Sequence, residues 1–303
     1  MYSKMRTYPF TKSFSREPIK QTKSYSERLS AFSQALEKAE CVVIGAGAGL
    51  SAAAGLEYGG KRFVSNFGDF IHRYALPDMY AAMFYPWSAE EERWAYQARH
   101  ILLNRYDNDS ACPLYRQLLQ LIGSRDYFVI TTNVDGLFKK SGFSPDRVFE
   151  VQGDYAYMQC AAGCHYRLYY NEELVREMSR QTEDCRIPSS LIPHCPVCGG
   201  RMYIHVRKDA YFVEDGRWKE SLNNYSSFMR GSYGAYTLLI ELGVGFNTPT
   251  IIRFPFEEMA AQADNITLVR INRDYTENQA RVNSFIPFNE DINEIVADMN
   301  NLL

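Results

Sequence analysis

The stretch that most restricts the fold of this chain is CVVIGAGAGLSAAAG, residues 41–55, where an apolar run leads into closely spaced glycines. Such a run is typical of a buried strand that ends in a tight turn, and the residues after the turn favour a helix. Residues 47–52 match the loose G-x-G-x-x-A form of a dinucleotide-binding turn. Glycine lets backbone N–H groups approach a phosphate closely, but the same residues also fit a turn that needs glycine for its conformation alone.

Similar apolar runs along the chain predict the other strands of a sheet. They cover residues 127–132, 148–151, 236–242, 250–254 and 266–272, and helical spacing covers 26–39, 113–122 and 290–303. Strands that alternate with helices indicate a parallel sheet that is covered on both faces. We therefore predict an α/β fold built on a Rossmann-like, doubly wound parallel sheet.

Two stretches do not fit this alternation. Residues 61–105 are rich in aromatic residues and predict helices without a strand, whereas residues 155–212 carry closely spaced cysteines. We interpret both as insertions that together form a smaller lobe, the first helical and the second a zinc ribbon. The Rossmann-like domain then comprises residues 26–60, 106–154 and 213–303.

The N-terminal residues and the overall charge restrict the possible partners. Residues 1–25 predict a flexible basic arm, and a transit peptide is the less favoured interpretation of the same residues. The formal net charge is −3, so neither nucleic acid nor an anionic membrane is expected as the main partner. Since no apolar run approaches the roughly 18–20 residues of a membrane span and no signal-peptide core is visible, we expect a cytoplasmic protein.

A second polar motif, TTNVDGLF at residues 131–138, directly follows a predicted strand. Asn133 and Asp135 then fall at the carboxyl end of that strand, where ligands bind in doubly wound folds. An Asn and an Asp two residues apart can also form an ordinary turn. The combination with the glycine turn favours a binding site. An ordinary dehydrogenase is disfavoured, because the expected second strand ending in an acidic residue is missing after the glycine turn.

The cysteines predict a structural zinc site. An odd count of seven argues against a disulfide framework. Four of the seven form two close pairs, Cys160 with Cys164 and Cys195 with Cys198, which is the arrangement that tetrahedral Zn²⁺ requires. Cys185, His165 and His194 lie between the pairs as possible substitutes, and free, partly buried thiols are the alternative interpretation.

The order of these motifs resembles the sirtuin family. The resemblance rests on GAGLSAAAG (47–55), TTNVDGL (131–137), a strand that ends near Gly153 and the two cysteine pairs, and it covers about residues 40–275. It implies a Rossmann-like domain and a small zinc-bearing lobe, with NAD bound between them as a co-substrate.

The resemblance also implies which residues contact NAD. Gly47, Ala48, Gly49, Ser51 and Gly55 would line the pyrophosphate and ribose, Asn133 and Asp135 would hold the nicotinamide end, Gly243, Val244 and Gly245 would form a later turn, and Asn272 would contact the adenosine ribose. The remaining cofactor-binding candidates are Leu56, Tyr58, Arg62, Phe63, Thr132, Gln152, Asn247 and Arg273.

The chain departs from the family at Gln152, in VQGD, where sirtuins have a catalytic histidine. A histidine titrates near neutral pH and can act as a base, whereas an amide only donates and accepts hydrogen bonds. Deacylation should therefore be lost or slow, because a missing acid–base group costs roughly 10²–10⁴-fold. Gln152 could also merely end a strand. In addition, Val213 stands where the family's acyl-lysine groove has glycine, and LEYGGKRF (56–63) replaces I-P-D-F-R.

With Asn133, Asp135 and Gln152 as the catalytic set, the pattern is similar to the macrodomain-linked sirtuins of microbial pathogens. That group implies protein ADP-ribosylation, with a lipoylated carrier protein of the glycine-cleavage H type as the target and a macrodomain hydrolase as functional partner. Two alternatives stay open. One is a deacylase that uses another base, such as Asp154, and the other is a non-catalytic sensor of NAD or ADP-ribose.

Overall fold

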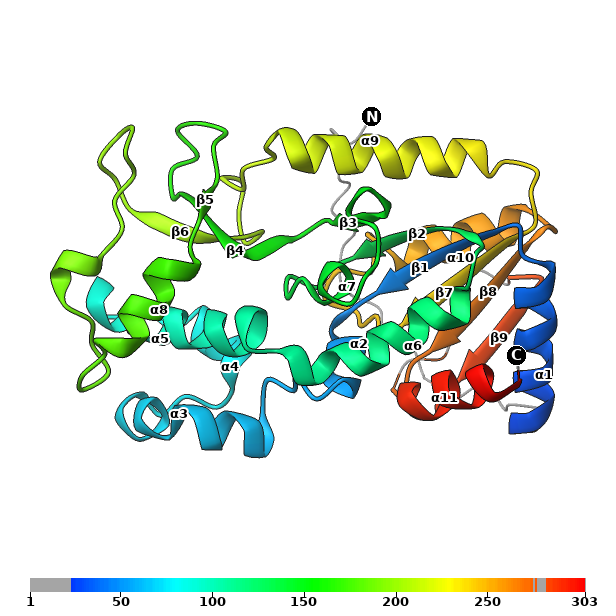
Figure 1. Cartoon of the computed structure of the whole chain (residues 1–303), viewed down its shortest axis with the longest axis horizontal. Helices are drawn as coiled ribbons and strands as arrows, with labels where there is room; N and C mark the ends of the chain where they lie inside the picture. Colours follow the sequence, from blue (N-terminus) through cyan, green and yellow to red (C-terminus); the bar gives the residue numbers. More distant parts are fainter. Residues whose placement is uncertain (1–22, 275, 277–281, 303) are drawn as a thin grey trace, which may run out of the picture.

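The computed structural model describes residues 23–274, 276 and 282–302, so the predicted basic arm lies outside the described residues except for its last three. A six-stranded sheet forms one end of the molecule (Figure 1). Its spatial order is β3 (Val148–Glu150), β2 (Asp126–Thr131), β1 (Cys41–Ala46), β7 (Thr237–Leu242), β8 (Ile266–Ile271) and β9 (Phe285–Phe288). All neighbouring strands are parallel, which confirms the predicted doubly wound fold. The strand order reverses between β1 and β7, and this is the position at which such folds bind ligands.

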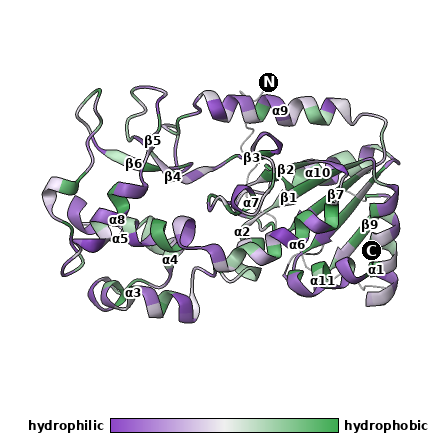
Figure 2. Cartoon of the chain, viewed as in Figure 1, coloured by the Kyte–Doolittle hydropathy of each residue, from purple (hydrophilic) through white to green (hydrophobic). Residues whose placement is uncertain are grey.

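Both faces of the sheet are covered by helices, as the apolar strands require (Figure 2). The covering helices are α1 (Tyr25–Lys38), α6 (Cys112–Ile122) and α11 (Ile292–Leu302) on one face, and α9 (Gly216–Gly231) and α10 (Arg253–Gln262) on the other. In β1, Val42 and Ile44 pack toward the first face and Val43 toward the second. Because side chains alternate along a strand, a continuous β-branched run is what a strand buried on both faces needs.

Local signals set the ends of the helices. At the start of α1, the Ser24 hydroxyl accepts a hydrogen bond from the Glu27 amide, and the Glu27 carboxylate accepts one from the Ser24 amide, which completes a capping box. Pro113 lies in the first turn of α6, where a missing N–H costs nothing. The same helix ends at Gly123, whose φ of 63° favours glycine.

The smaller lobe occupies the opposite end of the molecule (Figure 1). It contains α3 (Gly60–Tyr74), α4 (Met79–Met83), α5 (Glu90–Ile101), the π-helical turn η1 (Leu102–Tyr106), β4 (Gly153–Cys160), β5 (Tyr169–Tyr170), α8 (Glu172–Arg180) and β6 (Met202–Val206). The strands form an antiparallel sheet in the order β5-β4-β6. Phe67 and Trp94 share one hydrophobic cluster with Val175 and Ile204, so both insertions contribute to one core. On this basis we propose the domain boundaries inferred from the sequence.

In the parallel sheet, two strand assignments differ from the prediction, and the short antiparallel strands β4, β5 and β6 were not predicted individually. The predicted strand at 250–254 is wrong, because these residues form a turn and the start of α10. Pro255 fits the first turn of a helix but would remove a hydrogen bond from a central strand. Strand β9 was not predicted, and it contains Pro287, which an edge strand tolerates. Among the described residues, no helix is long and apolar enough to cross a membrane.

A buried quartet of charges joins β7, β8 and α10. Arg270 donates from Nε and Nη2 to the two carboxylate oxygens of Glu241, each at 2.8 Å, and its Nη1 lies 2.7 Å from Glu257 Oε1. Arg253 Nη1 lies 3.5 Å from Glu241 Oε1, and the side chains of Arg253, Arg270 and Glu241 are 0% exposed. The four charges compensate one another, so removal of one carboxylate leaves buried positive charge that is less well compensated.

We predict that Glu241→Ala lowers the free energy of unfolding by about 3–5 kcal/mol, because the buried guanidinium of Arg270 loses its bidentate carboxylate partner. Asp69→Ala is the matched control, since Asp69 forms an equally bidentate pair with Arg99 at the surface. That change should cost less than about 1 kcal/mol. Urea unfolding curves of the three proteins measure both values, and equal losses in the two variants would contradict the account.

Candidate functional site

The site is built on a close contact between two turns at the carboxyl ends of β1 and β7. The Gly47 amide donates to Leu242 O and the Gly49 amide to Gly243 O, both at 3.0 Å. A Cβ on Gly47 would lie 2.8 Å from Gly243 O, and a Cβ on Gly49 would lie 2.6 Å from Gly243 Cα. Gly243 itself has a φ of 59°. No larger residue fits at these three positions without moving one turn, so glycine is required here for packing as well as for conformation.

The Asn-x-Asp loop joins this contact. It connects β2 to α7 (Leu137–Lys140), and Asn133 Nδ2 donates to Gly47 O at 3.0 Å. Asp135 accepts from the Ser51 hydroxyl at 2.6 Å and from the Leu137 amide at 3.0 Å. Ser51 lies in α2 (Ala48–Ala53), which follows the glycine turn. The structure therefore brings together the two motifs that the sequence singled out.

The side chain of Asp135 is buried, and only 6% of the surface of this residue is exposed. Desolvation raises the pKa of this carboxyl above its ordinary value, because burial disfavours the charged form, although the Ser51 hydroxyl opposes the shift. A buried acidic group at a strand end is a frequent feature of functional sites. Its carboxylate can stabilise positive charge that develops nearby during a reaction.

Gln152 lies in the turn between β3 and β4. Its backbone carbonyl accepts from the Arg207 amide at 2.9 Å, which fixes the turn. Its side-chain Oε1 is buried and has no hydrogen-bond partner among the described residues. A buried acceptor without a donor costs about 1–3 kcal/mol, so this oxygen is available to a donor on a ligand.

Asp154, the alternative base, is the second residue of β4, and its carboxylate is already hydrogen-bonded within the protein. Its carboxylate accepts two hydrogen bonds from Arg105, at 2.7 and 3.2 Å, and a third from the Ala156 amide at 2.8 Å. Both carboxylate oxygens of Asp154 are therefore already engaged in hydrogen bonds within the protein. Neither Arg105 nor its contact with Asp154 was predicted. The polar run NRYDND at 104–109 is the only signal of it in the sequence.

The segment after α2, which comprises a loop and the first turn of α3, is anchored in the smaller lobe. Tyr58 Oη lies 3.0 Å from Tyr155 Oη, and burial raises the pKa of Tyr58 to about 12. Arg62 donates to Asn104 Oδ1 at 2.8 Å and to Leu103 O at 3.0 Å. Leu56 and Phe63 are buried, and Phe63 packs on Phe67. Thus this segment links the two lobes. The contacts of Leu56, Tyr58, Arg62 and Phe63 with the cofactor remain predictions.

The predicted adenosine end lies on the other side of β7. Asn272 Nδ2 donates to Val244 O at 2.8 Å, so the residue after β8 is tied to the Gly243 turn. Asn247 is exposed, and the Arg273 side chain is 84% exposed beside Asp274. The structure therefore brings Asn272 to the site and leaves Arg273 and Asn247 at the surface.

The peptide groups of the segment around Val213 form hydrogen bonds within the protein. The Val213 amide donates to Gln159 Oε1 at 3.0 Å, and Gln159 Nε2 donates to Tyr211 O at 2.8 Å. Val213 O accepts a hydrogen bond from His205 Nε2 at 3.0 Å. A Cβ on Gly153 would lie 3.1 Å from the Phe212 ring, so the segment borders the Gln152 turn.

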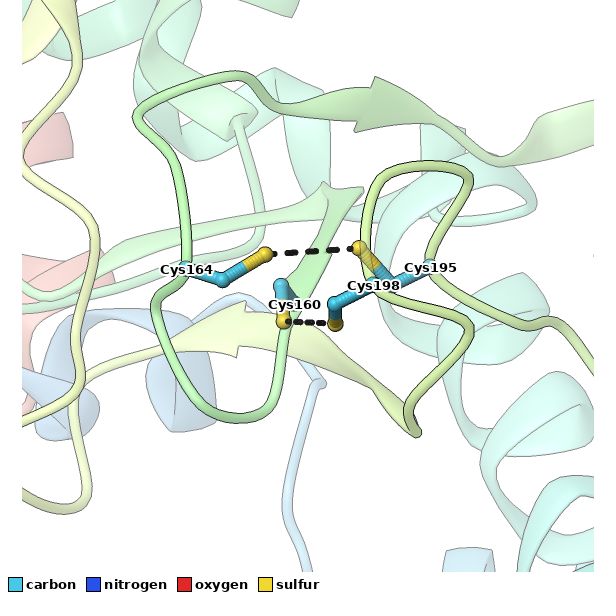
Figure 3. A group of neighbouring side chains, drawn as sticks. All are labelled: Cys160, Cys164, Cys195 and Cys198. Carbon is cyan, nitrogen blue, oxygen red and sulfur yellow. Dashed lines mark hydrogen bonds between the residues drawn. The ribbon is translucent and has the colours of Figure 1, made fainter.

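The four paired cysteines come together in the smaller lobe (Figure 3). All four Sγ atoms lie within 4.8 Å of one another, with 3.7 Å between Cys160 and Cys198 and 3.6 Å between Cys164 and Cys195. A tetrahedral zinc with bonds of about 2.3 Å separates its sulfurs by about 3.8 Å, so the group fits Zn²⁺. His165 lies beside the group, with Nδ1 3.0 Å from Cys164 Sγ. Four thiolates leave no open position, which is typical of a structural site.

We predict that the protein purifies with about one zinc per chain and that Cys195→Ser loses it. Cys185→Ser is the matched control, because Cys185 is buried in the same lobe but lies outside the group of four. Elemental analysis after dialysis measures the zinc content. Equal zinc loss in both variants, or no zinc in the unmodified protein, would contradict the assignment.

Comparison with known proteins gives a consistent result. The Sir2 family profile matches residues 47–229. A "Protein ADP-ribosyltransferase" of Staphylococcus aureus (strain Mu50 / ATCC 700699) is 35% identical over 240 residues, which covers 79% of this chain and 76% of that protein. A "Probable bifunctional ADP-ribose hydrolase/ADP-ribosyltransferase" of Fusarium oxysporum f. sp. cubense is 33% identical over 286 residues. This alignment covers 89% of the chain but only 46% of that longer protein.

The fold has solved relatives. The crystal structure of a Sir2 homologue in complex with NAD aligns over 90% of this chain and 93% of that chain, with a TM-score of 0.55 and 16% identity. At this identity the likeness concerns the fold alone. It agrees with the parallel-sheet fold described above.

Proposed function

The chain belongs to the Sir2 family, and from this premise we propose that it transfers ADP-ribose from NAD to a target protein and releases nicotinamide. The names of the two curated relatives support the transferase activity. The single observation that carries the proposal is Gln152. It stands where the family has its catalytic histidine, and its buried Oε1 has no hydrogen-bond donor among the described residues.

The residues at the switch point fit an NAD molecule. At Gly47, Gly49 and Gly243 the two turns meet backbone to backbone at the carboxyl edge of the sheet, where doubly wound folds bind a pyrophosphate. Asn133 is fixed by its bond to Gly47 O, and Asp135 by its bond to Ser51. NAD supplies the ribose carbon C1′, its bond to nicotinamide and the ADP-ribosyl group that is transferred.

The chemistry asks for little acid–base catalysis. The bond from C1′ to the nicotinamide nitrogen breaks with its electron pair going to nicotinamide, and a bond from C1′ to the acceptor atom forms. Asp135 stabilises the positive charge that develops at C1′. Gln152 Oε1 accepts from a ribose hydroxyl and holds the sugar in position for the acceptor. A carboxylate acceptor has no proton to lose, so no general base is needed.

Deacylation is less well supported by the same contacts. It needs a base for the ribose hydroxyls, Gln152 cannot serve as one, and Asp154 is bound by Arg105. In addition, Val213 stands at the predicted acyl-lysine groove with its peptide groups bonded to Gln159 and His205, which leaves fewer groups for a substrate backbone.

For the target, we propose a lipoylated carrier protein of the glycine-cleavage H type, and for the functional partner a macrodomain hydrolase that removes the mark. Both rest on the sequence resemblance. The Fusarium relative is named as a hydrolase as well as a transferase, which supports pairing of the two activities. The cytoplasmic location belongs to the same proposal.

We predict that incubation with NAD and a lipoylated H-type carrier adds one ADP-ribosyl mass to the carrier, with equal release of nicotinamide. Gln152→Ala should slow the transfer roughly 10²-fold, because the ribose is no longer held in position. Gln34→Ala, on the exposed face of α1, is the control and should have no effect. Intact-mass spectrometry of the carrier measures the transfer.

Other outcomes of this experiment separate the alternatives. Nicotinamide release without ADP-ribose on the carrier would exclude the proposed target. Formation of O-acyl-ADP-ribose from an acetyl-lysine peptide would instead favour a deacylase. Tight NAD binding without nicotinamide release, unchanged in Gln152→Ala, would favour a sensor.

We also predict that Asp135→Asn slows nicotinamide release about 10²–10³-fold without loss of stability near neutral pH. The folded protein raises the pKa of Asp135, so the contribution of this group to stability is greatest below the unfolded pKa and is lost as the pH rises through the folded pKa. A neutral amide avoids that loss and can still contact Ser51 and Leu137. Urea midpoints and nicotinamide assays measure the two effects, and a less stable but fully active variant would contradict both.

A further inference from the structure

Arg105 lies where the two lobes meet. It belongs to η1, the π-helical turn that follows α5, and π-helical turns frequently occur at functional sites. Its Nε and Nη2 donate to the two carboxylate oxygens of Asp154 at 2.7 and 3.2 Å. Only 18% of the Arg105 side chain and 11% of the Asp154 side chain are exposed, so water competes little for this pair. Because Asp154 follows Gln152 by two residues, the pair fixes the Gln152 turn.

The same guanidinium group packs against the Asn-x-Asp loop. A Cβ on Gly136 would lie 2.4 Å from Cζ and 2.8 Å from Nη1 of Arg105, so the guanidinium occupies the space beside the Gly136 backbone. Gly136 has a φ of 69° and directly follows Asp135. One side chain of the smaller lobe therefore touches both segments that carry the proposed catalytic residues.

The neighbours of Arg105 bind further parts of the site. Asn104 Oδ1 accepts from Arg62 in the first turn of α3, at 2.8 Å. Asn108 Nδ2 donates to the Asp135 backbone carbonyl at 3.2 Å. Tyr106 Oη donates to Asn171 Oδ1 at 2.7 Å, which connects the segment to the residue before α8. Residues 104–108 thus contact several segments that are far apart in the sequence.

We propose that Arg105 is a positioning residue for the transfer reaction: it holds the Gln152 turn and the Asp135 loop in one relative arrangement through Asp154 and Gly136. The expected effect of Arg105 on catalysis rests on the proposed function. Its expected effect on the two loops rests only on the contacts described above. Arginine is required rather than lysine, because only a planar guanidinium can donate to both carboxylate oxygens while one of its faces lies on a glycine backbone.

Loss of the side chain should act on the rate rather than on NAD affinity. In Arg105→Ala, the Asp154 carboxylate loses its counterion and the Gly136 backbone loses its packing, so both loops become free to shift. A displacement of about 1 Å at reacting groups can cost roughly 10²-fold in rate. Arg105→Lys keeps the charge but not the geometry and should lose most of the same activity.

The test uses the full chain and two readouts. Hydrogen–deuterium exchange, which needs no activity, should increase in residues 133–137 and 152–156 of Arg105→Ala, whereas the cores of both lobes stay protected. With NAD and the carrier, kcat for nicotinamide release should fall about 10²-fold while the KM for NAD changes less than about 3-fold. Added guanidinium ion should restore part of both properties, because the variant leaves a cavity of its shape.

Arg99→Ala is the matched control. It removes an arginine of α5 with an equally bidentate carboxylate partner, Asp69, at the surface away from these loops. It should change neither the loop exchange nor the rate, and guanidinium should have no effect on it. Unchanged exchange in both loops of Arg105→Ala, or the same change in Arg99→Ala, would overturn the proposal. Uniformly raised exchange throughout Arg105→Ala would also overturn it, since that result indicates a general structural role.

The two proposals can fail separately. If the unmodified protein releases no nicotinamide with any acceptor, the proposed function fails, and the loop exchange of Arg105→Ala and its recovery with guanidinium still decide whether Arg105 positions the loops. If nicotinamide is released and Arg105→Ala matches the unmodified protein in kcat and in exchange, the positioning role fails while the transferase proposal stands.

Discussion

The contact of Gly47 and Gly49 with Gly243 is the constraint on which the site depends. It joins the turns that follow β1 and β7, where the strand order reverses, and it leaves room for backbone only. Asn133 is placed by its hydrogen bond to Gly47 O, so the Asn-x-Asp loop takes its position from this contact. Asn272 is placed by its bond to the residue after Gly243. A side chain at any of the three glycines would separate the turns and shift both asparagines.

Near this contact, two buried polar side chains lack the hydration or the hydrogen bonds that would stabilise them in the folded protein. Asp135 is a buried carboxyl group whose pKa is raised by desolvation, and Gln152 presents a buried oxygen without a donor. Such groups cost folding free energy and are expected at sites where a ligand completes the hydrogen bonding. By contrast, the buried charges of Glu241 and Arg270, away from the predicted nicotinamide end, are fully paired.

Local patterns predicted much of this structure, and contacts between distant residues could not be predicted. The strands buried on both faces and the cysteine group were visible because β-branched runs and close thiol pairs are local signals. The strand at 250–254 was wrong because a short apolar run does not distinguish a strand from a turn before a helix, and only Pro255 argued for the latter. The pair of Arg105 with Asp154 joins residues 49 positions apart through a π-helical turn, and no local periodicity reports such a contact.

The central claim is that Gln152 positions the ribose and does not exchange protons with it. A crystal structure with NAD and the Asp135→Asn variant, which binds but turns over slowly, tests this most directly. The account predicts that Gln152 Oε1 lies within about 3.2 Å of a hydroxyl oxygen of the nicotinamide ribose. A ribose whose hydroxyls are instead contacted by an ionisable side chain, with the Gln152 amide turned away, would contradict it.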